Sequence, residues 1–577
     1  MKGGGFLTIC LEALESWAVL MKCKLTILAW FVILIALTGC AEKPAQPVSD
    51  VLMIAQTATV IAPASQFTPE REPPLSVWLS ATIPSEVRKN LPIPEGMMAA
   101  QDRETADLYV LPMTGDMAGD VIVAAVWTYV LAAPFPTLLD SVRIGAVESA
   151  WKGDWSPEFK NQTLLVSPET AEVFRVLWGP ESERKVQVVA ANTILEKAWQ
   201  EEDYWALLPF EQLGPRWKVL RVGGYSPLDE GFVPQSYDLS VFFAWQGEQE
   251  VMSRWQEMSD AGQPFLQNRD PSRITTVIMS GTTAMVRVLA FQMEQKGITY
   301  PGVQVRDWLL PADLVHVSNE VPMFAGCPPA VPLREEQRFC SAPEYLALLQ
   351  YLGVDLIELT GNHILDWGQE AFKETLSLYA ENDLPYYGGG LDVDDGREPY
   401  LFEHNGNRLA FVGCNAAGPE NVWATRDLAG AAPCDMAWLA ATVQQLRADG
   451  YLPIVTFQHY EMEDHLPVSK QRVDFQNIAR EGAVIVSGSQ AHYPQTMTFV
   501  GDTFVHYGLG NFLFDQMYEG NRRSFLDRHV FYDGKYLNTE LLTIILEDGA
   551  QPRPMTRTER EVLLEVIFEK SVWSTMQ

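Results

Sequence analysis

The chain has 577 residues, which is too long for one ordinary domain, so we expect two or more. Its 47% hydrophobic and 20% charged residues are typical of a globular protein and exclude a disordered chain. The formal net charge of −32 argues against a nucleic-acid partner, because binding phosphates requires clustered Lys and Arg. It also disfavours a purely electrostatic grip on an anionic polymer, so a metal ion or a local basic patch would have to supply that attraction.

The first forty residues have the pattern of an export signal. Basic residues precede an apolar run at 25–37, and small residues follow it up to Cys40. The final Leu-Thr-Gly-Cys resembles a bacterial lipobox, which implies cleavage before Cys40 and lipid attachment to it. An uncleaved anchor is the alternative, but the run is shorter than the about 20 residues of a spanning helix. We therefore expect a signal peptide over residues 1–40 and an extracytoplasmic protein, lipid-anchored to the cell membrane.

Two different segments follow the expected anchor. Residues 41–75 are rich in Pro, Ala, Ser and Thr, which is typical of a tether. Residues 76–268 mix short apolar strands with helical stretches, which predicts an N-terminal α/β domain. The segment 205–227 faintly resembles the two-lobed periplasmic binding proteins, and that resemblance names no ligand.

Four cysteines follow the lipobox. Outside the cytoplasm cysteines can form disulfides. The two close pairs favour Cys327–Cys340 and Cys414–Cys434, although four cysteines allow three connectivities. A zinc site is the alternative, but no Cys-x-x-Cys spacing supports it.

From Ile274 onward strands alternate with helices, so residues 274–577 predict a layered α/β domain. Ser341-Ala-Pro-Glu344 is typical of a capping box that starts a helix. Chemistry on such sheets gathers on the loops beyond the strand ends. Further helices are expected at 369–382 and 436–448, and strands at 275–279, 314–317, 354–359, 409–413, 453–457, 483–487 and 503–507.

Those loops carry polar residues of the kinds that metal sites use. Glu320 follows one strand, Gly361-Asn-His363 follows the next, and His492 lies beyond a later one. A hydrolytic metal site combines carboxylate, imidazole and amide oxygens from separate strands. These loops supply all three ligand types.

The ordered set of motifs resembles the CapA (poly-γ-glutamate synthesis) family, over roughly residues 274–577. That family is related to calcineurin-like metallophosphoesterases, so the resemblance implies a sandwich of sheets and a divalent metal ion as cofactor. The motifs are Glu320, Gly361-Asn-His363 with Asp366 and Gly368, the Gly388–Gly390 turn, Gly482-Ala483 leading to His492, and Gly510-Asn-Phe512 with Asp515.

The resemblance also implies roles for single residues. Asn362, Glu320 and His492 would be metal ligands, and His363 would be the general acid. Asp366 would orient His363 or only cap the turn.

At the next loop the alignment is ambiguous. Either His459 and Glu463 match the family's His-Trp-Gly-x-Glu segment and His459 is a further ligand, or Gln458 takes the histidine's place and His459 is incidental.

Two departures weaken the expected ligand set. The family's first strand ends in Gly-Asp, but Ser280-Gly-Thr-Thr283 carries a hydroxyl there. A segment that is usually rich in histidine reads Gly488-Ser-Gln-Ala-His492 and keeps one imidazole. Two ions, one weakly held ion or none therefore remain open.

Two functional hypotheses follow. The first is an envelope-anchored protein that makes or handles an extracellular anionic polymer, poly-γ-glutamate or similar, through metal-dependent hydrolysis. The second is a catalytically silent binding or assembly protein for a cell-envelope polymer.

Overall fold

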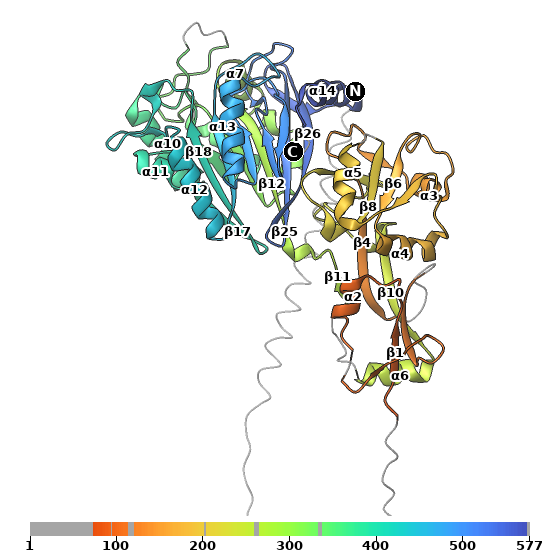
Figure 1. The fold of residues 1–577 in the computed structure, drawn as a ribbon. Coiled ribbons are helices and arrows are strands. Elements are labelled where there is room, and N and C mark those ends of the chain that lie inside the picture. The colour runs from red at the N-terminus through yellow and green to blue at the C-terminus, as the bar shows by residue number, and fades with distance from the viewer. Residues whose placement is uncertain are drawn as a thin grey trace, which may run out of the picture. The chain divides into compact units, whose positions relative to one another are not determined.

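The computed structural model describes residues 73–93, 95–113, 121–200, 203–258, 265–332 and 337–573 (Figure 1). The predicted signal peptide, Cys40 and almost all of the tether lie outside the described residues. Among the residues that are described, no helix has the length and apolar character needed to cross a membrane.

The N-terminal region is α/β and is built on one mixed sheet, which has eleven strands within the described residues. The long central strand β4 (Val123–Pro134) pairs with β10 near its start and with β8 and β9 near its end, so it joins the two halves of the sheet. The other strands are β1 (Ser76–Leu79), β2 (Met98–Ala99), β3 (Leu108–Pro112), β5 (Ser141–Val142), β6 (Thr163–Val166), β7 (Val186–Val188), β8 (Tyr204–Pro209), β9 (Trp217–Val222), β10 (Ser240–Gly247) and β11 (Leu266–Gln267). The helices are α2 (Ser85–Asn90), α3 (Ile144–Lys152), α4 (Pro168–Trp178), α5 (Ile194–Gln200) and α6 (Gln249–Met258).

The C-terminal region contains two sheets that pack face to face. The first has the order β15-β14-β13-β12-β25-β26-β27, with β24 beside β12, and the second has the order β17-β18-β20-β21-β23-β22. The strands of the first are β12 (Ile274–Thr283), β13 (Leu314–Asn319), β14 (Leu356–Glu358), β15 (Tyr386–Tyr387), β24 (Asn511–Leu513), β25 (Arg523–Tyr532), β26 (Lys535–Glu547) and β27 (Gln551–Pro554). Those of the second are β17 (Tyr400–His404), β18 (Asn407–Asn415), β20 (Leu452–Gln458), β21 (Ile485–Gly488), β22 (Met497–Val500) and β23 (Thr503–His506), and β16 (Gly389–Gly390) pairs with β19 (Gly430–Ala431) nearby.

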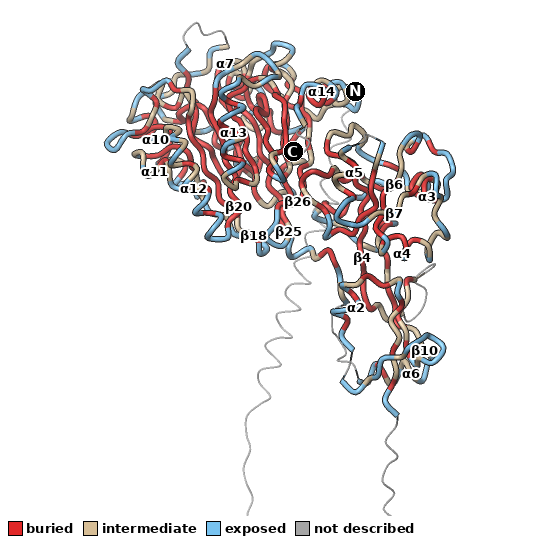
Figure 2. The backbone as a smooth tube through the Cα atoms, viewed as in Figure 1, coloured by how far each residue is buried: buried red, intermediate tan, exposed pale blue. Residues whose placement is uncertain are grey.

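Helices cover the outer faces of these sheets, which gives a layered α/β architecture as predicted (Figure 1). The first sheet packs on α7 (Arg287–Lys296), α9 (Leu346–Tyr351) and α10 (Gln369–Glu381), and the second on α12 (Met436–Ala448) and α13 (Ser469–Arg480). Figure 2 shows the strands almost wholly buried beneath exposed helix surfaces and loops. Shorter helices α8 (Arg306–Leu309) and α11 (Val393–Arg397) lie in connections.

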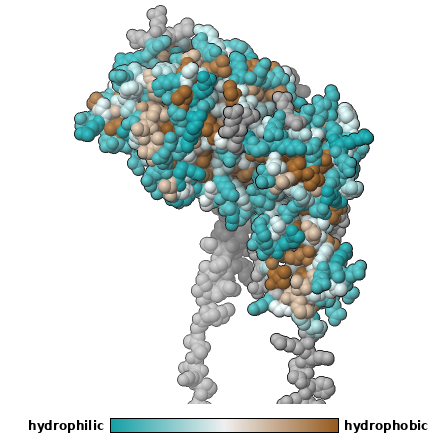
Figure 3. Space-filling view, viewed as in Figure 1, coloured by the Kyte–Doolittle hydropathy of each residue, from teal (hydrophilic) through white to brown (hydrophobic). Residues whose placement is uncertain are grey.

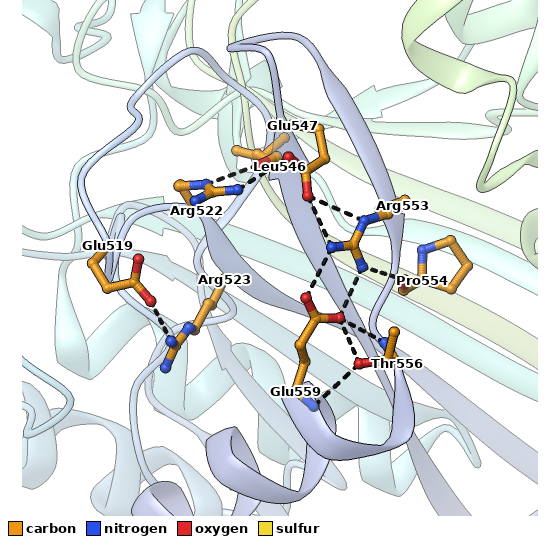
Figure 4. A network of polar contacts seen from close by, with 9 residues as sticks. All are labelled: Glu519, Arg522, Arg523, Leu546, Glu547, Arg553, Pro554, Thr556 and Glu559. Atoms are coloured by element: carbon orange, nitrogen blue, oxygen red, sulfur yellow. Dashed lines mark hydrogen bonds and ion pairs between the residues drawn. The ribbon is translucent and has the colours of Figure 1, made fainter.

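The last helix, α14 (Arg557–Lys570), closes one end of the space between the sheets with its apolar residues. Its N-terminus has a complete capping box between Thr556 and Glu559. Arg553 donates hydrogen bonds to both Glu547 and Glu559, so it ties the helix to β26 (Figure 4).

Each strand and helix that was predicted by residue range in the C-terminal region is present, within a few residues of its expected ends. The predicted capping box at Ser341 is wrong. The Ser341 hydroxyl donates to the carbonyl oxygen of Met285, and a 3₁₀ turn at Pro343–Tyr345 precedes the helix. The surface seen in Figure 3 is mostly hydrophilic, as expected of a chain with a net charge of −32.

Candidate functional site

The candidate site lies where neighbouring parallel strands of the two sheets end. Along β13 the side chains of His316 and Ser318 face the other sheet, and Glu320 continues this alternation just beyond the strand. Along β20 the inward face runs through Ile454 to Gln458. Glu320 and Gln458 therefore meet at the open end of the space between the sheets.

Gln458 joins two of the predicted ligands. Its Nε2 donates to Oε1 of Glu320 at 3.4 Å and to Oδ1 of Asn362 at 3.2 Å. Its Oε1 accepts from the hydroxyl of Ser489 at 3.1 Å. Glu320 and Gln458 are 1% and 0% exposed, so this is a buried network with fixed donors and acceptors. Glycine is required at 361, because a Cβ there would lie 2.5 Å from the Glu320 Cα.

His459 points away from this network. Its Nε2 lies 3.1 Å from Oδ2 of Asp474 on α13, and its ring contacts Phe475 on the same helix. Consecutive residues of a strand face opposite sides, so Gln458 and His459 cannot both face the other sheet. Of the two alignments left open by the sequence, the geometry favours the one that puts Gln458 in the histidine's place.

His363 and Asp366 form a pair beside the network. The Nδ1 of His363 lies 2.9 Å from Oδ2 of Asp366, which also accepts from the backbone N–H of Phe339 at 2.7 Å. Burial acts to lower the pKa of His363, but the bond to Asp366 and the charge of Glu320 outweigh it, so the pKa is raised. The Asp366 carboxylate therefore orients the imidazole and favours its charged form.

His492 approaches from the second sheet. Its Nδ1 lies 2.6 Å from Oδ1 of Asn511, and its Nε2 lies 3.4 Å from Oε1 of Glu461. Burial raises the pKa of Glu320, and the charges of His492 and His363 act to lower it. The structure thus groups Glu320, His363 and His492 around one polar region.

A buried carboxylate that the sequence reading did not select supports this region. Glu358, on β14, is 1% exposed, and its Oε1 accepts from Thr360 at 2.6 Å and from Ser489 at 3.2 Å. Burial raises the pKa of Glu358 and the hydroxyl donors act to lower it. The Ser489 hydroxyl is within hydrogen-bonding distance of both Glu358 and Gln458, so it lies between the carboxyl group and the amide. The signal for it in the sequence was Glu358 itself, an acidic residue within the mostly apolar run 354–359.

These residues do not fit a two-metal centre as they stand. Thr282 occupies the place of the expected aspartate, and its hydroxyl donates to the backbone oxygen of Ser489 at 2.6 Å. The oxygens of Glu320 and Asn362 that a cation would share instead accept from one amide group. Across the described ranges, no group of three or more His, Cys, Asp or Glu is arranged to hold a metal ion.

Two disulfides lie near this region of the fold. Cys327 is bonded to Cys340, and Cys414 is bonded to Cys434. The first closes a loop whose end carries Phe339, the residue that contacts both Asp366 and the His363 ring.

A family model matches part of the C-terminal region, and two curated proteins are similar to parts of the chain. Residues 276–516 match the model of the family described as bacterial capsule synthesis protein PGA_cap. The capsule biosynthesis protein CapA of Bacillus anthracis is 23% identical over 311 residues, covering 53% of this chain and 75% of that protein. The PGA biosynthesis protein CapA of Bacillus subtilis is 24% identical over 184 residues, covering 32% and 48%.

Comparisons with solved structures give matches of low similarity. The NAD nucleotidase NadN of Haemophilus influenzae is 10% identical with a TM-score of 0.30, covering 53% of this chain and 57% of that one. An ABC-type phosphate transport receptor from Vibrio cholerae is 10% identical with a TM-score of 0.27, covering 32% and 92%.

Proposed function

We propose that this protein acts in making or handling an extracellular anionic polymer of the poly-γ-glutamate type, because residues 276–516 match the model of the bacterial capsule synthesis (PGA_cap) family. It does so by binding or assembling the polymer rather than by metal-dependent hydrolysis. The observation that carries this choice is the Gln458 amide, which bridges Glu320 and Asn362. With that bridge in place, the Glu320 side chain has a hydrogen-bond donor and does not require a cation as its partner.

An anionic polymer needs a positive group at the site, and we assign this role to the imidazole of His363. Its side chain is 23% exposed, and its pKa is raised against the effect of burial by Asp366 and Glu320. A charged imidazole can donate a charge-assisted hydrogen bond to a carboxylate of the polymer. Because the whole chain is strongly acidic, this local charge has to select and position a small segment of the polymer.

The test is binding of poly-γ-glutamate to the purified full chain, measured calorimetrically with and without a chelator. We expect a complex that the chelator leaves unchanged and a polymer whose length distribution stays constant. His363→Ala should weaken binding about tenfold, the loss of one charge-assisted hydrogen bond. His404→Ala is the matched control, because His404 lies at the β17–β18 turn and contacts Thr275. Absence of a complex, or equal losses in both variants, would contradict the proposal.

Metal-dependent hydrolysis is a second candidate function. The observation in its favour is the His363–Asp366 pair, because a histidine oriented by a carboxylate is suited to proton transfer. Shortening of the polymer that requires a divalent ion and disappears in His363→Ala would replace the binding proposal with this one.

Envelope anchoring is part of the same proposal. We propose that Cys40 carries a lipid that holds the chain on the outer side of a membrane. Cys40→Ala should move the protein from the membrane fraction to the soluble fraction and abolish incorporation of a labelled fatty acid. Unchanged fractionation would refute the lipid anchor and leave the polymer-binding proposal standing.

A further inference from the structure

Arg287, the first residue of α7, lies between two phenyl rings next to the candidate site. Its guanidinium carbon is 5.0 Å from the ring centroid of Phe339 and 5.2 Å from that of Phe514. Both distances are within the range of cation–π contacts. The two rings belong to segments far apart in the sequence, so the arginine connects them.

Each phenyl ring in turn contacts one of the site histidines. The Phe339 ring meets the His363 ring at a centroid distance of 4.8 Å, edge to face. The Phe514 ring stacks on the His492 ring at 4.9 Å. Five side chains therefore contact one another in a row, through two ring–ring and two cation–ring contacts. We call this set the stack: His363, Phe339, Arg287, Phe514 and His492.

Asp515 fixes the middle of the stack. Its Oδ1 and Oδ2 both accept from Nε of Arg287 at 3.1 Å, and Nη2 of Arg287 forms a second, shorter bond to Oδ1. The same carboxylate accepts from the backbone N–H of Val288 at 3.0 Å. Only 4% of the Asp515 side chain is exposed, so the ion pair is held rigidly by its surroundings.

The backbone at Arg287 is itself in an unfavourable conformation. Its φ of 46° lies in the left-handed region, which side chains other than glycine rarely adopt. Such a conformation persists where the surrounding structure demands a side chain at that position. Packing alone does not demand an arginine, because an apolar residue would fill the same gap without burying an ion pair.

We propose that Arg287 and Asp515 are positioning residues that hold the imidazoles of His363 and His492 at a fixed separation through Phe339 and Phe514. They act behind the site and touch no ligand themselves. The inference rests on the proposed function in so far as the two histidines are taken as site residues.

The test is nuclear magnetic resonance of the histidine side chains in the metal-free full chain. Labelled histidine gives one signal per imidazole, assigned by single His→Gln variants. In Arg287→Met we expect the signals of His363 and His492 to move together. The signals of His316, His506 and His529, which lie between the sheets, should move no further than in the control.

The control is Arg522→Met. Arg522 also forms an ion pair, with Glu547, and donates to the carbonyl oxygen of Leu546, but it contacts neither histidine (Figure 4). Its side chain is 24% exposed, close to the 23% of Arg287. Movement of neither site histidine in Arg287→Met, of only one, or of all signals to the same extent as in the control would overturn the proposal.

Two further variants keep the test decisive. Arg287→Lys keeps the charge and loses the planar stacking group, so both site signals should move less than in Arg287→Met. If Arg287→Met does not fold, Arg287→Met combined with Asp515→Leu removes both charges and should still move both signals. Failure of the wild-type chain to bind polymer would contradict the proposed function. The histidine resonance signals would still show whether the stack positions His363 and His492.

Discussion

At the scale of single residues, Gln458 decides what the site can hold. A side-chain amide offers two N–H donors from one nitrogen, so it can satisfy two oxygen acceptors at once. In this protein those acceptors belong to Glu320 and Asn362. The amide replaces the charge of a cation with two hydrogen bonds, and it cannot be displaced without leaving a buried carboxylate unsatisfied.

The first prediction concerns the Gln458 amide, which stands in place of a cation. Gln458→His combined with Thr282→Asp replaces the bridging amide by an imidazole and restores a carboxylate at the end of β12. We expect binding of Zn²⁺ or Mn²⁺ at least about tenfold tighter than in the wild-type chain, or about 1.4 kcal/mol, measured by titration calorimetry. Gln476→His is the control, since Gln476 lies on α13 and donates to Tyr507. Equal affinity in all three proteins would show that Gln458 does not control cation binding.

The sequence could place Gln458 and His459 at a strand end but could not say which one faces the site. The run 453–457 is buried on both of its faces, because one packs on the other sheet and one on α13. A buried strand of this kind lacks the polar–apolar alternation that would identify the inner face. The ambiguity is therefore physical, and only the neighbouring layers resolve it.

At the scale of elements, the inner faces of β13 and β25 carry histidines where apolar residues would be expected. His316 and His529 are each 1% exposed and lie on strands paired with β12. Burial lowers the pKa of His316 to about 3 and that of His529 to about 4. Both imidazoles are therefore neutral in the folded protein at neutral pH.

The second prediction is a loss of stability in acid. The usual pKa of 6.5 lies above both folded values, so between about pH 6.5 and pH 4 the unfolded chain binds more protons. Stability is fully present above pH 6.5 and falls as the pH drops through this window. His529→Gln should reduce this loss of unfolding free energy by up to about 3 kcal/mol. The measurement is denaturant unfolding at a series of pH values from 7 to 4. A variant with the wild-type pH dependence would contradict this assignment.

Regular elements were predictable where hydrophobic spacing decides them, as in α12, which begins and ends at the expected residues. Ser341 shows the limit. Its spacing to Glu344 is that of a capping box, but a tertiary hydrogen bond to Met285, 56 positions away in the chain, takes the hydroxyl. Predictions from short sequence motifs do not take account of a partner that is distant in the sequence.

At the scale of the whole molecule, the N-terminal and C-terminal regions share apolar cores. One core combines Phe135, which follows β4, with residues of the second sheet and of α14. The Phe135 ring lies 5.2 Å from Phe499 and 5.3 Å from Phe504. Arg560 on α14 adds an ion pair to Asp140 at 2.9 Å. Residues Pro73–Gln577 accordingly form one compact unit.

The third prediction concerns cooperativity. If the shared core couples the two regions, calorimetry of the full chain should show one unfolding transition for residues 73–577. Phe135→Ala should remove about 3–5 kcal/mol and separate that transition into two, because the lost ring belongs to both regions. Phe159→Ala is the matched control: Phe159 is equally buried but packs on Trp205 within the N-terminal sheet, so it should lower the transition without dividing it. Two transitions already present in the wild-type chain would mean that the regions fold independently, and the polymer site would then need only the C-terminal region.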